Sequence, residues 1–225
     1  MVTNQHGERP EIARVVRRLL LPSLLSVLVL TGCASYFSSG SPPQYYKIDY
    51  AVSPSDCGGG WKDIVRVWPF SASAPYDREE MIILDAEHAL RFSSVYRWVA
   101  VPGVMVADRL LEDLGRSRLF AGATAPVNRL ASSLELSGHI HRFAWEDGGS
   151  GSKRAVLDVE VTLWREEPKR DVLFRRHYRL ESPPSASGSP EVMAEAMSRL
   201  VREMSESLQS DLCATRPGSS SRDDG

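Results

Sequence analysis

The sequence lacks an excess of charge of either sign. Its 27 lysines and arginines nearly balance its 29 aspartates and glutamates, which leaves a formal net charge of −2 over 225 residues. Basic and acidic residues are interspersed along the chain, whereas a nucleic-acid-binding domain carries a concentrated basic surface. The composition therefore gives no reason to expect a nucleic-acid partner.

Motifs for catalysis are missing too. The chain has no Gly-x-Ser-x-Gly elbow, phosphate-binding loop, dinucleotide fingerprint or His-Glu-x-x-His pair. The glycine-rich stretches at Gly58 and Gly148 lack the strand-to-helix context that a phosphate cradle requires. The sequence therefore predicts a protein that is not an enzyme and that needs no cofactor.

A hydrophobic run long enough to cross a membrane is absent as well. The most apolar stretch, Leu19–Leu30, contains about a dozen residues, whereas a membrane-spanning helix needs about 20. Three arginines, Arg14, Arg17 and Arg18, precede it. A basic flank before an apolar core of this length is typical of a secretory signal peptide.

This segment ends in Leu30-Thr31-Gly32-Cys33, which fits a bacterial lipobox. We predict cleavage between Gly32 and Cys33 and acylation of Cys33, whose sulfur forms the thioether to diacylglycerol. More than one acyl chain gives a stable anchor, at about 0.8 kcal/mol per buried methylene. An ordinary cleaved signal peptide and a retained N-terminal anchor are the alternatives. Ala34 follows in place of an aspartate, which by enterobacterial sorting predicts an outer-membrane protein facing the periplasm.

The mature chain has the length of one domain with tails and can bury its own core. The predicted division is a signal peptide at residues 1–32, an acylated flexible tether at 33–44, a folded domain at 45–213 and a disordered tail at 214–225.

Two cysteines remain once Cys33 is acylated. Cys57 and Cys213 would lie in an oxidising compartment, so they are candidates for one disulfide between an early loop and the end of the last helix. Two unpaired thiols are the alternative, because sequence spacing alone does not bring the pair together.

Alternating apolar residues predict a β-sheet with one polar face. The alternation is clearest where Leu157 and Val159 share one face and Asp158 and Glu160 share the other. Because one face is left for water, helices should cover the opposite face. The predicted class is α/β: a compact single domain with a mixed, mostly antiparallel sheet flanked by helices. Strands are predicted at residues 45–50, 64–68, 81–84, 95–99, 119–123, 134–145, 155–164 and 172–180, the last three forming an antiparallel meander.

Two segments have helical spacing, residues 104–116 and 190–212. Ser189 is a suitable N-cap for the second, with Pro190 in the first helical position. Its stripe of methionines, leucines and valine predicts a long C-terminal helix packed on the sheet. A face that binds lipid or a partner is the alternative, since methionine is common on adaptable surfaces.

Three histidines suggest an alternative function. His139 and His141 share a face of one predicted strand, and His177 lies on a nearby strand. Two such histidines can bind zinc, but the sequence does not identify the additional ligand that a site requires. We therefore predict no metal site and keep a periplasmic metal-binding protein or metalloenzyme using His139, His141 and His177 as the alternative.

Aromatic rings and prolines are concentrated between Trp61 and Pro102, with arginines among them. Most of these rings should fill one end of the core. Tyr76 in a turn, and Arg97 with Trp98 just before Pro102, are predicted to be exposed and to bind a partner, because interfaces favour aromatic residues and arginine.

Several short motifs follow the lipobox in a recognisable order: Tyr45-Tyr46-Lys47-Ile48-Asp49-Tyr50, Val65-Arg66-Val67 with Pro69-Phe70, Pro75-Tyr76-Asp77, Tyr96-Arg97-Trp98 and a Leu-x-Gly segment at 136–138. From Tyr45 to Leu212 the chain resembles the ABC-type transport auxiliary lipoprotein family, the group of paraquat-inducible protein C. Val99 after Trp98 departs from the Arg-Trp-Ala of the family pattern, and Cys57 is not a family feature.

The resemblance implies a compact α/β domain with a mixed sheet flanked by helices. It implies a non-enzymatic lipoprotein of a mammalian-cell-entry (MCE) type ABC transport system, which moves lipids between the two membranes and supports envelope integrity. The implied partners are a periplasmic MCE-domain protein and the permease and ATPase of the system, with the membrane bound through the lipid anchor. A homo-oligomer is left open, and a structural outer-membrane assembly lipoprotein is a further alternative.

Overall fold

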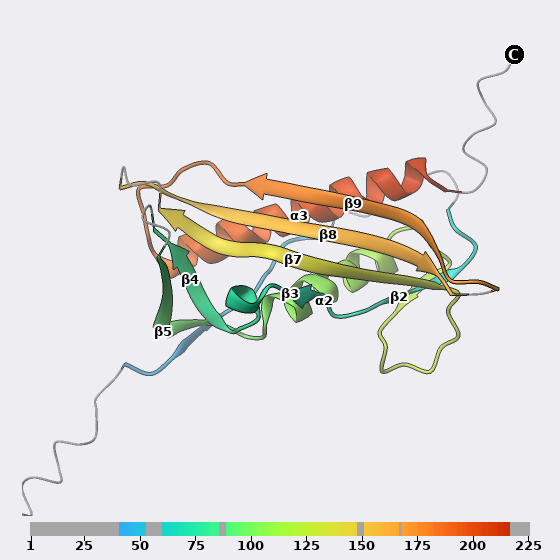
Figure 1. The fold of residues 1–225 in the computed structure, drawn as a ribbon, viewed down its shortest axis with the longest axis horizontal. Helices are drawn as coiled ribbons and strands as arrows, with labels where there is room; N and C mark the ends of the chain where they lie inside the picture. The colour runs from blue at the N-terminus through green and yellow to red at the C-terminus, as the bar shows by residue number, and fades with distance from the viewer. Residues whose placement is uncertain (1–40, 53–59, 86–88, 148–150, 167, 217–225) are drawn as a thin grey trace, which may run out of the picture. The chain divides into compact units, whose positions relative to one another are not determined.

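One long strand, β7 (Leu134–Asp147), organises the fold (Figure 1). The computed structural model describes residues 41–52, 60–85, 89–147, 151–166 and 168–216. The described residues from Pro43 onward form one compact unit. The predicted boundaries of the signal peptide, tether and tail lie in part outside the described residues and stay predictions.

On one side, β7 belongs to an antiparallel meander of three long strands. It pairs with β8 (Lys153–Arg165) along its whole length, and β8 pairs with β9 (Asp171–Glu181). The predicted alternation of β8 is confirmed, because Leu157 and Val159 are fully buried against the helices. The meander predicted from the sequence is therefore confirmed.

On its other side, β7 pairs in parallel with β2 (Ile64–Val67), β3 (Ser71–Ala72) and β4 (Glu80–Leu84), one after another. These three short strands lie beside β7 with gaps between them, and together we call them the interrupted strand. Three further strands extend the sheet. β6 pairs with β2, β5 pairs with β4, and β1 pairs with β5. In the described residues these make a mixed sheet of nine strands. The short strands are β1 (Gln44–Tyr46), β2 (Ile64–Val67), β3 (Ser71–Ala72), β4 (Glu80–Leu84), β5 (Leu90–Trp98) and β6 (Gly122–Thr124).

Two helices cover the same face of the sheet, as the alternation predicts. Figure 1 shows α2 (Pro102–Arg116) and α3 (Pro190–Ala214) behind the strands. The Ser189 cap is confirmed, since its side chain accepts a hydrogen bond from the Val192 N–H. The apolar stripe of α3 is buried in the core, with Met197, Val201, Met204, Leu208 and Leu212 inaccessible. The described residues contain no helix that is both long and apolar enough to span a bilayer.

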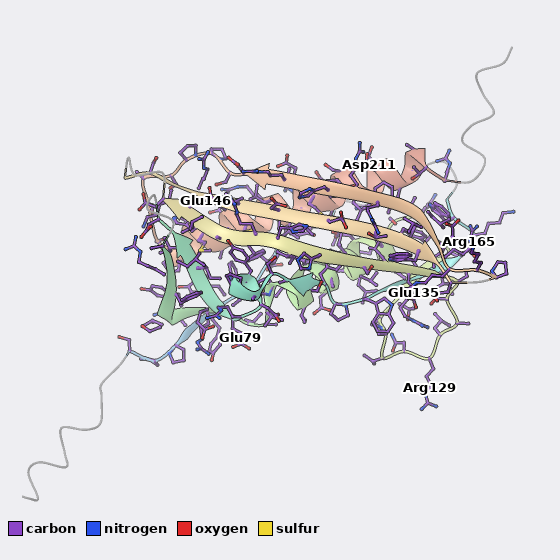
Figure 2. The ribbon with its side chains drawn as sticks, in the orientation of Figure 1. Glu79, Arg129, Glu135, Glu146, Arg165 and Asp211 are labelled. Atoms are coloured by element: carbon purple, nitrogen blue, oxygen red, sulfur yellow. The ribbon has the colours of Figure 1, made fainter. Side chains whose placement is uncertain are left out.

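A polar contact fixes the C-terminal half of α3 to β9. Asp211, labelled in Figure 2, accepts a hydrogen bond of 2.8 Å from the Tyr178 hydroxyl and forms an ion pair with Arg176. Burial and the neighbouring carboxylate raise the pKa of Tyr178. Tyr178 therefore stays protonated and keeps donating to Asp211 over the physiological range.

Three predicted strands differ from the structure. The strand predicted to begin at Val95 begins at Leu90, so residues 91–94 lie in β5 and do not form a connection. The strand predicted at 119–123 is wrong in part, because Leu119 and Phe120 are buried side chains of a bend and β6 begins at Gly122. The strand predicted at 45–50 ends at Tyr46. In the last two cases, buried side chains such as Ile48 and Leu119 suggested a strand, but tertiary packing buries them outside the sheet.

A buried carboxylate joins the two helices to the segment after β1. Asp113 on α2 is 1% exposed, and its Oδ2 accepts hydrogen bonds from the Tyr50 hydroxyl at 2.7 Å and the Ser205 hydroxyl at 2.6 Å. Burial and Asp113 raise the pKa of Tyr50. Asp113 therefore gives two buried hydroxyls their acceptor where apolar packing alone would leave them unsatisfied.

Asp113→Ala is expected to lower the free energy of unfolding by about 2–4 kcal/mol, because two buried hydroxyls lose their acceptor. Urea unfolding followed by tryptophan fluorescence measures the change. Tyr50→Phe removes one donor and keeps the acceptor, so it should cost less, about 1 kcal/mol. Equal stability of the Asp113→Ala variant and the unmodified protein would show that this contact does not hold the helices together.

Candidate functional site

An apolar pocket of about 210 Å³ opens at the end of the sheet where β4 and β5 meet the start of α3. Its walls are residues of the core, Met81, Ile83, Trp145 and Met193. Ser189 and Pro190 at the first turn of α3 close one side. Because the lining is mostly apolar, the pocket suits an apolar side chain or an acyl group.

Two exposed aromatic rings of β5 form the rim of this pocket. Phe92 is 43% exposed and Tyr96 37% exposed, and both line the opening. The guanidinium of Arg78 lies over the Phe92 ring at 4.3 Å, and Arg91 at the rim pairs with Asp85 at 3.8 Å. Exposed rings beside arginines are the composition of protein interfaces. We call Phe92, Tyr96 and the pocket behind them the β5 pocket surface.

The first strand and the last helix hold this surface in place. The Tyr46 hydroxyl on β1 donates a hydrogen bond of 2.6 Å to Glu191 in the first turn of α3, and its ring packs edge-on against Tyr96. The hydrogen bond to Glu191 raises the pKa of Tyr46 to about 12 and lowers that of Glu191. A negative charge at this position also suits the N-terminus of the helix. The rim is therefore built on regular secondary structure and not on a loop.

The exposure predicted for Tyr76 and Trp98 is wrong. Trp98 is 1% exposed and packs edge-on against Phe143, and Tyr76 in the 3₁₀ helix η2 (Ala74–Tyr76) is 8% exposed. Burial raises the pKa of Tyr76. Both rings belong to the core, so neither offers a surface for a partner.

Arg97 is partly exposed, as predicted, but two glutamates hold it. Its guanidinium lies 2.6 Å from Glu80 and 3.7 Å from Glu79, which Figure 2 labels near the lower edge of the domain. Its role in binding a partner stays a prediction.

The rim residues could be found only in part from the sequence. Phe92, Tyr96 and Trp98 all lie in β5, but the pairing of β5 with β4 changes register between Phe92 and Arg97, so even spacing alone does not place them on one face. Since the prediction began the strand at Val95, it did not connect Phe92 with the later rings. Trp98 lies deepest, with its ring packed against Phe143 of β7, whereas Phe92 and Tyr96 line the open pocket.

The cysteine predictions lie largely outside the described residues. Cys213 on α3 is disulfide-bonded in the structure. Cys57 and Cys33 both fall outside the described ranges, so the Cys57–Cys213 pairing and the acylation of Cys33 stay predictions.

The three histidines of the alternative prediction lie on the open face of the sheet and come together only in part. The ring of His141 is 4.7 Å from that of His139 and 5.3 Å from that of His177. Hydroxyls of Ser71 and Ser73 lie 2.8 and 3.2 Å from the two ring nitrogens of His139. The sequence prediction missed Asp158, which bonds to His177 from the strand between them.

The sequence model of a known family, described as ABC-type transport auxiliary lipoprotein component, matches residues 46–209. This chain belongs to that family. The resemblance noted in the sequence is therefore confirmed, and the match spans the described domain from β1 into the last turns of α3. Membership makes the protein an auxiliary component of an ABC transport system and a lipid-anchored, membrane-associated protein.

Solved structures share the fold of this auxiliary lipoprotein. Protein XCC0632 from Xanthomonas campestris is 17% identical with a TM-score of 0.67, and the match covers 76% of this chain and 96% of that one. The crystal structure of an uncharacterized protein gives a TM-score of 0.59 at 12% identity, covering 76% of this chain and 99% of that one. These likenesses show the α/β fold alone. No curated protein matches the sequence of the auxiliary lipoprotein significantly.

Proposed function

We propose that this protein is the outer-membrane lipoprotein of an MCE-type ABC transport system. In this role it helps to move lipids between the two membranes without catalysing a reaction itself. The observation that carries the proposal is the family match over residues 46–209 together with the lipobox that ends at Cys33. Acylation at Cys33 would hold the domain in the periplasm, where it can meet the MCE-domain protein of the system.

We further propose that the β5 pocket surface binds this periplasmic subunit. Phe92 and Tyr96 are exposed rings on a rigid strand, and the pocket behind them accepts an apolar side chain of the partner. Aromatic anchors that fill or frame a pocket supply much of the free energy of protein binding. The partner is therefore expected to present an apolar segment.

The point at which the chain enters the described domain supports the same partner. β1 begins at Gln44, which is opposite Tyr96 in the sheet. An extended chain covers at most about 3.5 Å per residue, so residues 33–43 can reach roughly 40 Å from the acylated cysteine. The tether thus joins the domain beside the β5 pocket surface and keeps that surface within reach of a subunit near the membrane.

Phe92→Asp and Tyr96→Asp are expected to weaken binding of the purified MCE-domain protein at least tenfold, because each places a charge on an apolar contact. The full acylated chain in detergent is titrated with the MCE-domain protein of the same system, and the dissociation constant is measured. Circular dichroism of each variant shows that it is folded.

Val127→Asp is the matched control. Val127 is an apolar residue that is 86% exposed, and it lies in the loop before the start of β7, whereas the β5 pocket surface is near the end of β7. The Val127→Asp variant should bind the MCE-domain protein as tightly as the unmodified protein does. Equal binding by all three variants would remove the β5 pocket surface as the contact, and failure of the unmodified protein to bind would overturn the proposed function itself.

A further inference from the structure

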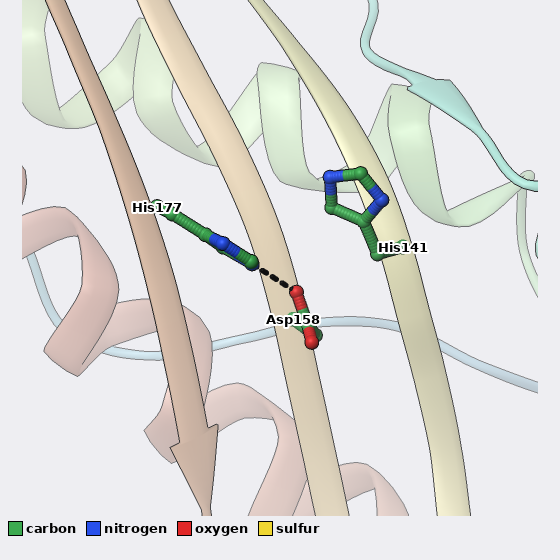
Figure 3. Close-up of side chains that lie close together, drawn as sticks. All are labelled: His141, Asp158 and His177. Carbon is green, nitrogen blue, oxygen red and sulfur yellow. Dashed lines mark hydrogen bonds and ion pairs between the residues drawn. The ribbon is translucent and has the colours of Figure 1, made fainter.

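Two histidines and an aspartate converge on the face of the sheet that the helices do not cover (Figure 3). His141 comes from β7, Asp158 from β8 and His177 from β9. One ligand atom of each residue lies within 4.8 Å of the others. Three neighbouring strands thus each contribute one group that can bind a metal ion.

A β-bulge brings His141 to this position. Ile140 is opposite Val159 and Arg142 is opposite Asp158, so His141 is the additional residue between two regular pairs. Bulges are frequent at sites because they re-aim one side chain. His177 is opposite Glu160, which places it diagonally from Asp158, and its imidazole Nε2 reaches the Asp158 carboxylate.

The charge of Asp158 is available to a cation. Its side chain is 12% exposed, and its carboxylate contacts Nε2 of His177. The arginines on either side of it in the sheet have carboxylates of their own. Arg142 lies 2.6 Å from Glu146, and Arg179 lies 3.6 Å from Glu181. Among the described residues, this largely buried carboxylate therefore contacts the His177 imidazole and forms no ion pair with an arginine.

His139 lies beside the cluster without belonging to it. Serine hydroxyls of the Ser71–Ser73 segment lie within hydrogen-bonding distance of both of its ring nitrogens, which ties the imidazole to the strand beside β7. In this position its ring packs against His141. Because Ser71 and Ser73 occupy both of its nitrogens, His139 is outside the ligand set, which consists of His141, Asp158 and His177.

We propose that His141, Asp158 and His177 bind a divalent transition-metal ion of the zinc class. Two imidazole nitrogens and one carboxylate oxygen are a ligand set that Zn²⁺ prefers, with water in the fourth position. Tetrahedral coordination at about 2.0–2.2 Å places ligand atoms roughly 3.3 Å apart. The exposed imidazoles reach this spacing by rotation of their side chains. The bound ion would join β7, β8 and β9 on the open face.

Zinc titration of the full mature protein in detergent tests this proposal. The protein carries no histidine tag, is treated with EDTA under non-reducing conditions and is then competed for Zn²⁺ against a chromogenic chelator at pH 7.5. We expect one Zn²⁺ per chain and an affinity at least tenfold lower in His141→Ala and in His177→Ala. Zinc should also raise the thermal unfolding midpoint of the unmodified protein, since an ion that binds the folded state stabilises it.

His139→Ala is the matched control, because it removes a neighbouring imidazole of the same strand that is outside the ligand set. It should bind Zn²⁺ within a few-fold of the unmodified protein. Circular dichroism without metal verifies that each variant is folded. The proposal is overturned if the unmodified protein binds no stoichiometric zinc, if both ligand variants bind as tightly as it does, or if His139→Ala loses as much affinity as they do.

Discussion

Cys33→Ala should abolish acylation and remove the protein from the outer membrane. Alanine has no sulfur to form the thioether, and the lipoprotein peptidase acts on the acylated cysteine. Each acyl chain of about 14 methylenes contributes roughly 11 kcal/mol of membrane binding, at about 0.8 kcal/mol per methylene. Without the chains, the polar surface of the domain gives no comparable attachment.

Radiolabelled palmitate and separation of the two membranes measure this loss. The unmodified protein is expected to take up label and to sediment with the outer membrane, and Cys33→Ala to do neither and to retain residues 1–32. Cys57→Ala is the matched control, because it removes a cysteine outside the lipobox and should be acylated normally. A Cys33→Ala protein that is processed, anchored and fully competent would refute the lipobox and the role proposed for it.

Gly103→Ala is expected to destabilise the domain by about 3 kcal/mol or more. A Cβ on Gly103 would lie 1.9 Å from the backbone oxygen of Phe70, which no side-chain rotation relieves. Phe70 has no room to withdraw, because its ring lies against Gly138, where an added Cβ would be 2.3 Å away. Moving Phe70 away from residue 103 would also break the hydrogen bond of 3.1 Å from the Phe70 N–H to the Gly103 carbonyl.

Gly115→Ala on the same helix is the control for this prediction. Gly115 is exposed, and an added Cβ meets nothing closer than the Ala123 methyl at 4.0 Å. The substitution should stabilise the protein by about 0.5–1 kcal/mol, since alanine favours the helix. Urea unfolding of both variants gives the comparison. Equal effects of the two substitutions would contradict the close approach of α2 to Phe70.

The meander and the last helix were predictable because their patterns are long and locally complete. Leu157 and Val159 alternate with polar residues over the whole of β8, and the methionines of α3 recur at helical spacing. The parallel pairing of β2, β3 and β4 with β7 was not predictable in the same way. Each of these strands has five residues or fewer, and its partner lies far along the chain. Such pairings depend on tertiary contacts that no local pattern encodes.

The two sites were predicted unequally. The region of the aromatic surface was found, but Trp98 was predicted to be exposed and Phe92 was not singled out, because exposure along β5 depends on its change of register against β4 and on tertiary packing. For the histidine cluster, the sequence supplied His141 and His177 and marked Asp158 as lying on a polar face. Whether Asp158 meets them depends on the register of β7, β8 and β9 and on the bulge at His141. Neither is visible in one sequence.

The interrupted strand beside β7 has a consequence for export across the inner membrane. β2, β3 and β4 pair with β7, which is synthesised about 60–70 residues later. β1 pairs with β5, which is synthesised about 50 residues later. Contacts this distant in sequence form late, since loop closure must precede them. β2, β3 and β4 therefore lack the strand that joins them until β7 has emerged, which would keep this part of the sheet incomplete during the export that the predicted signal peptide implies.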